Sequence, residues 1–360
     1  MTNKWNLSKE YLTDCINKGI ILLDNRYLSK ENQEEIKEDI SNFKRFLSGN
    51  YEDYLTPIQH YNSTEQIKKS ILNKMKKHYY LFGEYLINWI INLNKANIFD
   101  VPYSCDQTEF SIDTQIEFTL KNYEKHSKYF LKYAKKILTA SPGHTIQLIK
   151  DLETTSYCYY PNKLITTEPI IFIDPTECFW TLNHEIQHGI EYILNINPYD
   201  IYQELGPILF ELLYTDLIYK EEGFIYGGDY QDRLDDIKYK LDSIYQYFTM
   251  IKIFAKTNFE VPTEKFKDFF LDQIEITNDS LTDFLHEQIL GNGIDLDIRY
   301  VFSFLKAIEL KNQIKKQDID IAYVLEPYIR HNNFNFIPPK FGFQIYEEYT
   351  KEMHQKTRIK

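Results

Sequence analysis

The chain has 360 residues, of which 43% are hydrophobic, and its formal net charge is −12. The acidic balance argues against nonspecific nucleic-acid binding, which needs a positive field. The sequence has no apolar run of the roughly 18 residues that suggest a transmembrane helix, and its start lacks the pattern of a secretory signal. We therefore expect no membrane association and a cytoplasmic protein, in which the four scattered cysteines stay reduced.

The first hundred residues predict successive amphipathic helices, at about 8–18, 30–48, 64–78 and 79–95. The stretch from Val101 to Ser111 is typical of a loop. We therefore expect an N-terminal helical, lid-like region at 1–105 and a second domain at 106–360 that carries the functional site.

The second part begins with a long helix pattern from Ile112 to Leu138, which stops before Pro142-Gly143. Two short aromatic and β-branched runs follow, Ser156–Tyr160 and Ile170–Ile173, and both are typical of strands. In hairpin relation they would form a small sheet. The predicted fold class is therefore mainly α with a small β-sheet.

The next segment contains His184-Glu185-Ile186-Gln187-His188, which is the pattern H-E-x-x-H. Two histidines four residues apart on a helix lie on one face, where both imidazoles can bind one Zn²⁺. The glutamate between them can act as a base toward a zinc-bound water.

The residues around this pattern divide the helix into two faces. With about 100° of rotation per residue, one face is apolar, and His184 and His188 lie roughly opposite to it. The apolar face consists of Phe179, Leu182, Ile186, Ile190 and Ile193. The sequence thus predicts a helix that turns one side to the core and the other to a cleft.

A further predicted helix, from Pro207 to Lys220, is apolar almost all round and ends before Gly223. Glu211 lies in its middle, and a buried carboxylate without a partner is costly. A metal ion would supply the partner, so Glu211 is the predicted third zinc ligand. The alternatives are Glu204 or Glu191 as the ligand, or a Glu211 that is paired with a lysine or arginine.

After Gly223 the pattern predicts helices at 232–250, 280–288 and 297–314. Ile337-Pro338-Pro339 ends the regular structure, and a short charged helix or tail is expected beyond it.

These residues resemble the zinc oligopeptidases of the oligoendopeptidase F and thimet oligopeptidase family, over roughly residues 110–315. Members of that family share four short motifs in a fixed order. These are an aromatic residue followed by Cys, the tripeptide Pro-Tyr-Ile, an acidic residue or Asn, and Thr-Leu-x-His-Glu. The matching segments here are Ser156-Tyr157-Cys158, Pro169-Ile170-Ile171, Asp174 and Thr181-Leu182-Asn183-His184-Glu185. Phe210-Glu211 resembles the setting of the family's third ligand, and Tyr300–Phe304 resembles its late tyrosine-rich helix.

The resemblance implies a zincin-like helical peptidase that encloses a channel and acts on short, unfolded oligopeptides. His184, His188 and Glu211 would bind Zn²⁺ and Glu185 would be the base. Tyr300 or His286 would donate a hydrogen bond to the oxyanion, and the peptide would pair with the strand Ile170–Ile173.

The chain departs from the family at several positions. The family has Gly and His where Gln187 and Glu191 stand, and tyrosines where Phe302 and Phe304 stand. The alternative hypothesis is therefore a catalytically weak, metal-containing partner protein that binds peptides or assists their maturation. The oligomeric state does not follow from the sequence.

Overall fold

The computed structural model shows a mainly helical protein with a small sheet, which confirms the predicted fold class. It describes residues 6–25, 27–51, 64–94, 110–139, 145–150, 155–196, 200–223, 225–260 and 293–316. It also describes the shorter stretches 289–291, 319–329, 351–352 and 357–358, and the single residues Leu152, Phe266, Tyr349 and Gln355.

The chain begins with two helices, α1 (Lys9–Leu23) and α2 (Lys30–Leu47). The bounds of α2 are close to the prediction, whereas α1 continues past residue 18, where its end was predicted. Each starts where a serine side chain accepts a hydrogen bond from a backbone N–H of the first turn: Ser8 from Tyr11 and Ser29 from Asn32. Their apolar faces pack together into a small core of their own.

Helix α3 (Thr64–Asn94) replaces two predicted helices. It is kinked at Gly83, where φ is +68°, and not at residue 79 as the sequence suggested. It packs against α8 (Gly227–Lys256), which in turn packs against α11 (Gly293–Lys316). All three contribute to the main core.

The single helix predicted from Ile112 to Leu138 is wrong, because the structure has two helices there: α4 (Ile112–His126) and α5 (Lys128–Thr139). They meet at Ser127, whose backbone is extended. The Ser127 side chain accepts a hydrogen bond from the Phe130 N–H and so caps the second helix. The break allows the two helices to pack against each other.

The main sheet has three strands, β1 (Ile146–Leu148), β2 (Tyr157–Tyr159) and β3 (Ile170–Ile173), in the order β1-β3-β2. β2 and β3 are antiparallel, as the sequence predicted, whereas the parallel partner β1 was not predicted. β3 is buried on both faces: Ile170 and Phe172 join the core of α1 and α2, and Ile171 and Ile173 join the main core.

The remaining described elements follow the sheet. Helix α6 (Thr181–Ile193) and helix α7 (Leu205–Glu222) flank the short 3-10 helix η1 (Asp200–Tyr202), and α7 ends at Gly223 in the left-handed conformation, as predicted. Near the end of the chain lies α12 (Ile321–Ile329). The strands β4 (Ile225–Tyr226) and β5 (Thr357–Arg358) have two residues each and pair in parallel.

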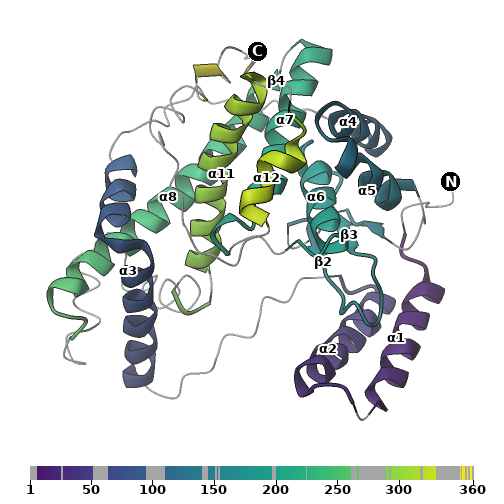
Figure 1. The fold of residues 1–360 in the computed structure, drawn as a ribbon, viewed down its shortest axis with the longest axis horizontal. Helices are drawn as coiled ribbons and strands as arrows, with labels where there is room; N and C mark the ends of the chain where they lie inside the picture. Colours follow the sequence, from purple (N-terminus) through teal and green to yellow (C-terminus); the bar gives the residue numbers. More distant parts are fainter. Residues whose placement is uncertain are drawn as a thin grey trace.

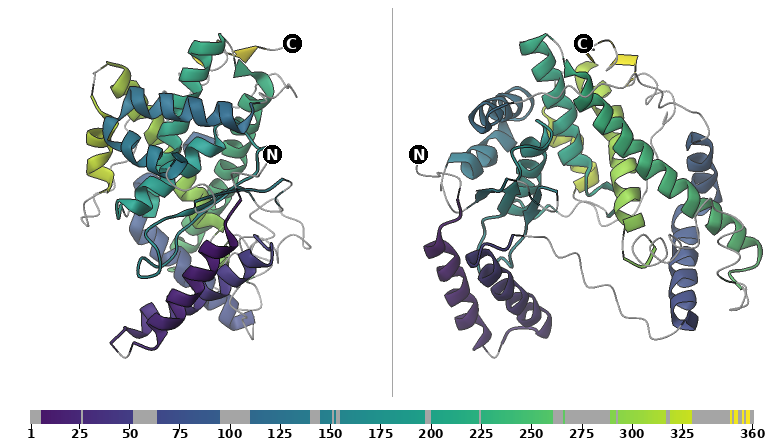
Figure 2. Two further views of the ribbon diagram at one scale, coloured as in Figure 1. Left: turned by 90° about the vertical axis from the view of Figure 1, so that its right-hand side faces the viewer. Right: turned by 180° about the vertical axis from the view of Figure 1, so that it is seen from behind.

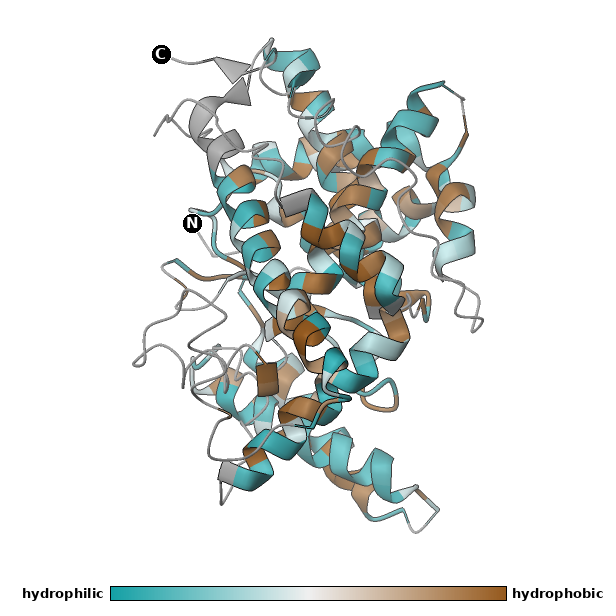
Figure 3. Ribbon diagram, turned by 90° about the vertical axis from the view of Figure 1, so that its left-hand side faces the viewer, coloured by the Kyte–Doolittle hydropathy of each residue, from teal (hydrophilic) through white to brown (hydrophobic). Residues whose placement is uncertain are grey.

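The described elements form an arch (Figure 1). Helix α3 is one leg, the α1–α2 pair is the other, and α4 to α8, α11 and α12 join them, as the view from behind also shows (Figure 2). Apolar residues recur at helical spacing along the elements, with hydrophilic residues between them (Figure 3). Among the helices that the structure describes, none has both the length and the apolar composition of a membrane span.

The boundary predicted near residue 105 lies outside the described residues. Helices α1 and α2 pack on the sheet, whereas α3 belongs to the main core with α8 and α11. The first three helices are therefore divided between the two legs of the arch.

Candidate metal centre

Helix α6 has the two faces that the sequence predicted. Leu182, Ile186 and Ile190 are fully buried in the main core. The side chains of His184 and His188 retain 13% and 12% exposure. The ring centroids of the two histidines are 4.8 Å apart, so both imidazoles serve one site.

A network of side-chain to backbone hydrogen bonds fixes the turn that leads from β3 into α6. Asp174 accepts from the N–H groups of Leu152 and Thr176, and its own N–H donates to the Ser156 hydroxyl. Glu177 accepts from the Ser156 N–H. These bonds connect the strands to the start of the helix that carries His184.

Three potential ligand atoms converge beside α6. The Nε2 atoms of His184 and His188 lie 3.1 Å apart, and Oε2 of Glu204 lies 3.3 Å and 3.2 Å from them. Ligand atoms at ~2.0–2.1 Å from a tetrahedral zinc are themselves ~3.3 Å apart. Of the described residues, these three form the group that could hold a metal ion, and its donor chemistry and spacing fit zinc.

Glu211 lies on the other side of His184. Its Oε1 is 2.5 Å from Nδ1 of His184, and its Oε2 accepts a hydrogen bond of 3.0 Å from Nη2 of Arg233. The burial predicted for Glu211 is confirmed, at 3% exposure. Glu211 is paired with an arginine, which was one of the alternatives that the sequence left open. The distances favour Glu204 over Glu211 as the third ligand.

Glu211 still serves the site through His184. A carboxylate that accepts from Nδ1–H fixes the tautomer in which Nε2 is free to bind a metal. Arg233 holds that carboxylate, and its guanidinium lies 4.0 Å from the centre of the Trp180 ring. Arg233 and Trp180 were not predicted as site residues, because Arg233 lies on another helix, α8, and Trp180 joins the site through its contact with Arg233.

Glu191, the other alternative ligand, is not part of this group. Its Oε1 accepts a hydrogen bond of 3.0 Å from Gln187 Nε2, and the Tyr123 hydroxyl donates to Gln187 Oε1. Burial raises the pKa of Glu191 to about 7. The Glu191 carboxylate lies where a side chain at position 206 would be, and Gly206 has none. A Cβ added at Gly206 would lie 2.0 Å from Oε1 of Glu191.

The candidate base, Glu185, is buried at 6% exposure, and its Oε1 lies 3.9 Å from Nε2 of His184. Burial raises its pKa to about 7, although the positive charges of His184 and His188 act in the opposite direction. A carboxylate with that pKa can accept and release a proton near neutral pH.

The electrostatics of the group favour a positive charge between the carboxylates. Burial alone would lower the pKa of both histidines, but Glu211 and Glu204 raise that of His184 and Glu204 raises that of His188. The two histidines in turn hold the pKa of Glu204 well below its ordinary value, against the effect of burial. A divalent cation supplies such a charge.

The two predicted oxyanion donors have different outcomes. Tyr300 of α11 is half-buried, and burial together with the charge of Glu211 raises the pKa of its hydroxyl well above its ordinary value. The hydroxyl therefore stays protonated and can donate, and Glu204 and Arg233 also act on its pKa. His286 lies outside the described residues.

Two further tyrosines lie beside His188. The Tyr160 ring lies 6.4 Å from that of His188 and stacks on Tyr192 at 5.5 Å.

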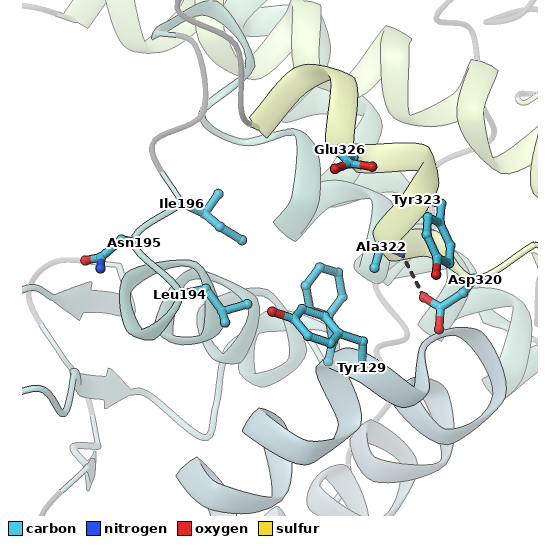
Figure 4. A pocket seen from close by; sticks show the side chains of 9 residues that line it. Tyr129, Leu194, Asn195, Ile196, Asp320, Ala322, Tyr323 and Glu326 are labelled. Atoms are coloured by element: carbon cyan, nitrogen blue, oxygen red, sulfur yellow. Dashed lines mark hydrogen bonds between the residues drawn. The ribbon is translucent and has the colours of Figure 1, made fainter.

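A cavity of about 340 Å³ lies beyond the C-terminal end of α6, between α5 and α12. There the side chains of Tyr129, Leu194 and Ile196 face those of α12, and Asp320 accepts from the Ala322 N–H (Figure 4).

Comparisons with known proteins add little. No family model matches the chain, and no curated protein matches it. A solved structure described as "a putative oligoendopeptidase F" from Bacillus anthracis str. Ames is 10% identical, with a TM-score of 0.43. The match covers 91% of this chain but only 64% of the other chain. A likeness of this degree does not indicate an activity.

Proposed function

We propose that the chain is a zinc-dependent endopeptidase that acts on short, unfolded peptides. His184, His188 and Glu204 would hold the metal. The observation that supports this most strongly is the triangle of ligand atoms with sides of 3.1, 3.2 and 3.3 Å beside an H-E-x-x-H helix. Glu204 takes the place that the sequence favoured for Glu211.

Each residue around the triangle has a proposed role. A bound zinc would lower the pKa of a water and polarise the scissile carbonyl. Glu185 would accept a proton from that water and pass it to the leaving amine. Tyr300 would donate a hydrogen bond to the oxygen on which negative charge develops. Glu211 and Arg233 would hold the ring of His184.

The strand that we expect to pair with the peptide is β2, in place of β3. The prediction for Ile170–Ile173 is wrong because β3 is the central strand and is hydrogen-bonded on both sides. β2 is an outer strand with half-exposed residues, and it packs near α6. An extended peptide can add to such an edge by main-chain hydrogen bonds.

The burial of the site supports short, unfolded substrates. The histidine side chains are 12–13% exposed, and that of Glu204 is 20% exposed. An extended chain can reach such a site along a strand edge, whereas the surface of a folded protein cannot.

The second candidate function is a metal-containing peptide-binding or maturation-partner protein of low activity. Its support is that Phe302 and Phe304 are buried in the core, at 0% and 1% exposure. In the segment from residue 300 to 304, Tyr300 is thus the tyrosine that could serve as an oxyanion donor.

A quenched fluorescent peptide library distinguishes the two functions. We expect the zinc-loaded protein to cleave some library members, a chelator to stop cleavage, and added zinc to restore it. Glu185→Gln should retain its zinc, since Glu185 is not a ligand, but lose about 10²–10⁴-fold in turnover because the base is gone. Full zinc content without cleavage of any member would favour the binding protein.

A further inference from the structure

A second cavity, of about 490 Å³, lies between α3 and α11 and also touches η1. We call it the α3–α11 cavity. Its charged side chains come from the two helices: Lys74 and Lys77 from α3, Asp295 and Arg299 from α11. Ile201 of η1 contributes to the same wall. Three cations thus face one carboxylate, in a protein whose net charge is −12.

The single carboxylate is already engaged. Lys74 Nζ lies 2.7 Å from Asp295 Oδ2, and His78 Nε2 lies 3.2 Å from Oδ1. The other ring nitrogen of His78 lies 2.8 Å from the Tyr247 hydroxyl. Although burial favours its neutral form, Asp295 has a pKa lowered to about 2 by His78 and Lys74. It therefore stays ionised and compensates Lys74.

The other two cations have no such compensation. Arg299 donates a hydrogen bond of 2.8 Å to Gln203 Oε1, which is a neutral amide. Within the described part of the chain, no carboxylate forms an ion pair with Arg299 or Lys77. The wall of the α3–α11 cavity therefore offers two positive charges to whatever enters it.

The cavity lies next to the candidate metal centre along the chain. Ile201 lines the cavity, Gln203 binds Arg299, and Glu204 is the proposed ligand. Three residues span at most about 11 Å, and an extended peptide rises about 3.3 Å per residue. A peptide whose scissile bond lies at the metal centre can thus reach the cavity within a few residues.

We propose that the α3–α11 cavity binds a carboxylate of the peptide substrate, an inference that rests on the proposed peptidase function. The carboxylate belongs either to the C-terminus of the peptide or to an acidic side chain near the cleaved bond. Lys77 and Arg299 are the groups that attract it.

Binding without turnover tests this directly. The zinc-loaded Glu185→Gln protein is titrated into three fluorescein-labelled octapeptide pools, and fluorescence anisotropy gives the Kd. One pool has neutral side chains and a free C-terminal carboxylate, the second is its C-terminal amide, and the third is the amide with one Glu per peptide. The titrations are repeated with Lys77→Glu and with Lys69→Glu, both in the Glu185→Gln background. Lys69 is an exposed lysine of the same helix, so both variants change the net charge equally.

We expect the free-acid or the Glu-containing pool to bind about two- to fivefold more tightly than the neutral amide at low salt. The preferred pool identifies the source of the carboxylate. Lys77→Glu should abolish the preference, and Lys69→Glu should keep it. Equal affinity for all three pools, or a preference that survives Lys77→Glu, overturns the inference.

The outcome separates this inference from the proposed function. If the wild type cleaves library peptides but the pools bind equally, the peptidase stands and the subsite fails. If the pools show the Lys77-dependent preference while the wild type cleaves nothing, the subsite stands and the peptidase fails.

Discussion

At the scale of single residues, the side of the imidazole on which a carboxylate lies decides its role. Glu204 lies beside Nε2 of His184 and Glu211 beside Nδ1. The first position is open to a shared metal ion, whereas the second is occupied by a hydrogen bond and an arginine. Two glutamates seven residues apart in the sequence, Glu204 and Glu211, thus act on one histidine from opposite sides.

Gly206 is a second decisive residue, because its missing side chain makes room for Glu191. In a helix, Gly→Ala ordinarily stabilises by about 0.5–1 kcal/mol. Here the added Cβ would lie 2.0 Å from Glu191 Oε1. We expect Gly206→Ala to destabilise the protein by about 1–3 kcal/mol, as overpacking does, and to weaken zinc binding by moving Glu204. Urea unfolding and a zinc titration measure the two effects.

The control for this prediction removes the carboxylate instead. In a Glu191→Ala background the severe overlap is gone, and the Gln187 amide, whose Nε2 would lie 3.2 Å from the new Cβ, no longer has Glu191 to bind and can move. Gly206→Ala should therefore cost less in this background than in the wild type, by more than the roughly 0.5 kcal/mol within which independent sites add. A Gly206→Ala protein as stable as the wild type would show that Glu191 lies elsewhere.

At the scale of elements, the sequence predicted those parts whose signal is local. The H-E-x-x-H helix, its two faces, the antiparallel strand pair and the buried α7 with its Gly223 cap all follow from periodicity and end residues. The break at Ser127 was missed because the apolar pattern continues across it. β1 was missed because three residues carry little periodicity.

The candidate site was less predictable than the helix that carries it. Burial of Glu211 followed from the apolar residues around it, but its partner Arg233 comes from another helix, α8. The ring atom that faces each carboxylate depends on how α6 and α7 pack. The central position of β3 likewise depends on β1, a strand that was not predicted.

The end of α4 carries a pH-dependent contribution to stability. Burial lowers the pKa of His126 from 6.5 to about 4, with a smaller effect from Lys125. Its Nε2 is buried and has no hydrogen-bond partner among the described residues. In that pH range the unfolded chain binds more protons than the folded protein, so stability falls as the pH decreases from about 6.5 to 4.

His126→Gln removes this titration. The free energy of unfolding of the wild type should fall by about 3 kcal/mol relative to the variant between pH 7 and pH 4. Urea unfolding of both proteins across this range measures the difference. Parallel pH profiles would show that His126 titrates normally in the folded protein.

At the scale of the whole molecule, the candidate site lies where the two cores meet. The sheet separates the core of α1 and α2 from the main core, and α6 packs beside it on the main-core side. The α3–α11 cavity lies in the leg formed by α3, whereas β2 and the three proposed ligands belong to the sheet, to α6 and to the start of α7 (Figure 1). Loss of α3 would remove one wall of that cavity, and loss of α1 and α2 would uncover the face of the sheet on which they pack.

The central claim is that His184, His188 and Glu204 bind zinc, and metal analysis of matched variants tests it most directly. The wild type and Glu204→Gln, Glu211→Gln and Glu191→Gln are loaded with zinc, equilibrated with a competing chelator, and their zinc content is measured. We predict about one zinc per chain in the wild type and loss of roughly 10–100-fold in affinity for Glu211→Gln, which acts through His184. Glu204→Gln should lose more than this, and Glu191→Gln the least. A wild type that takes up no zinc, or a Glu204→Gln protein that keeps it while Glu211→Gln is empty, would contradict the account.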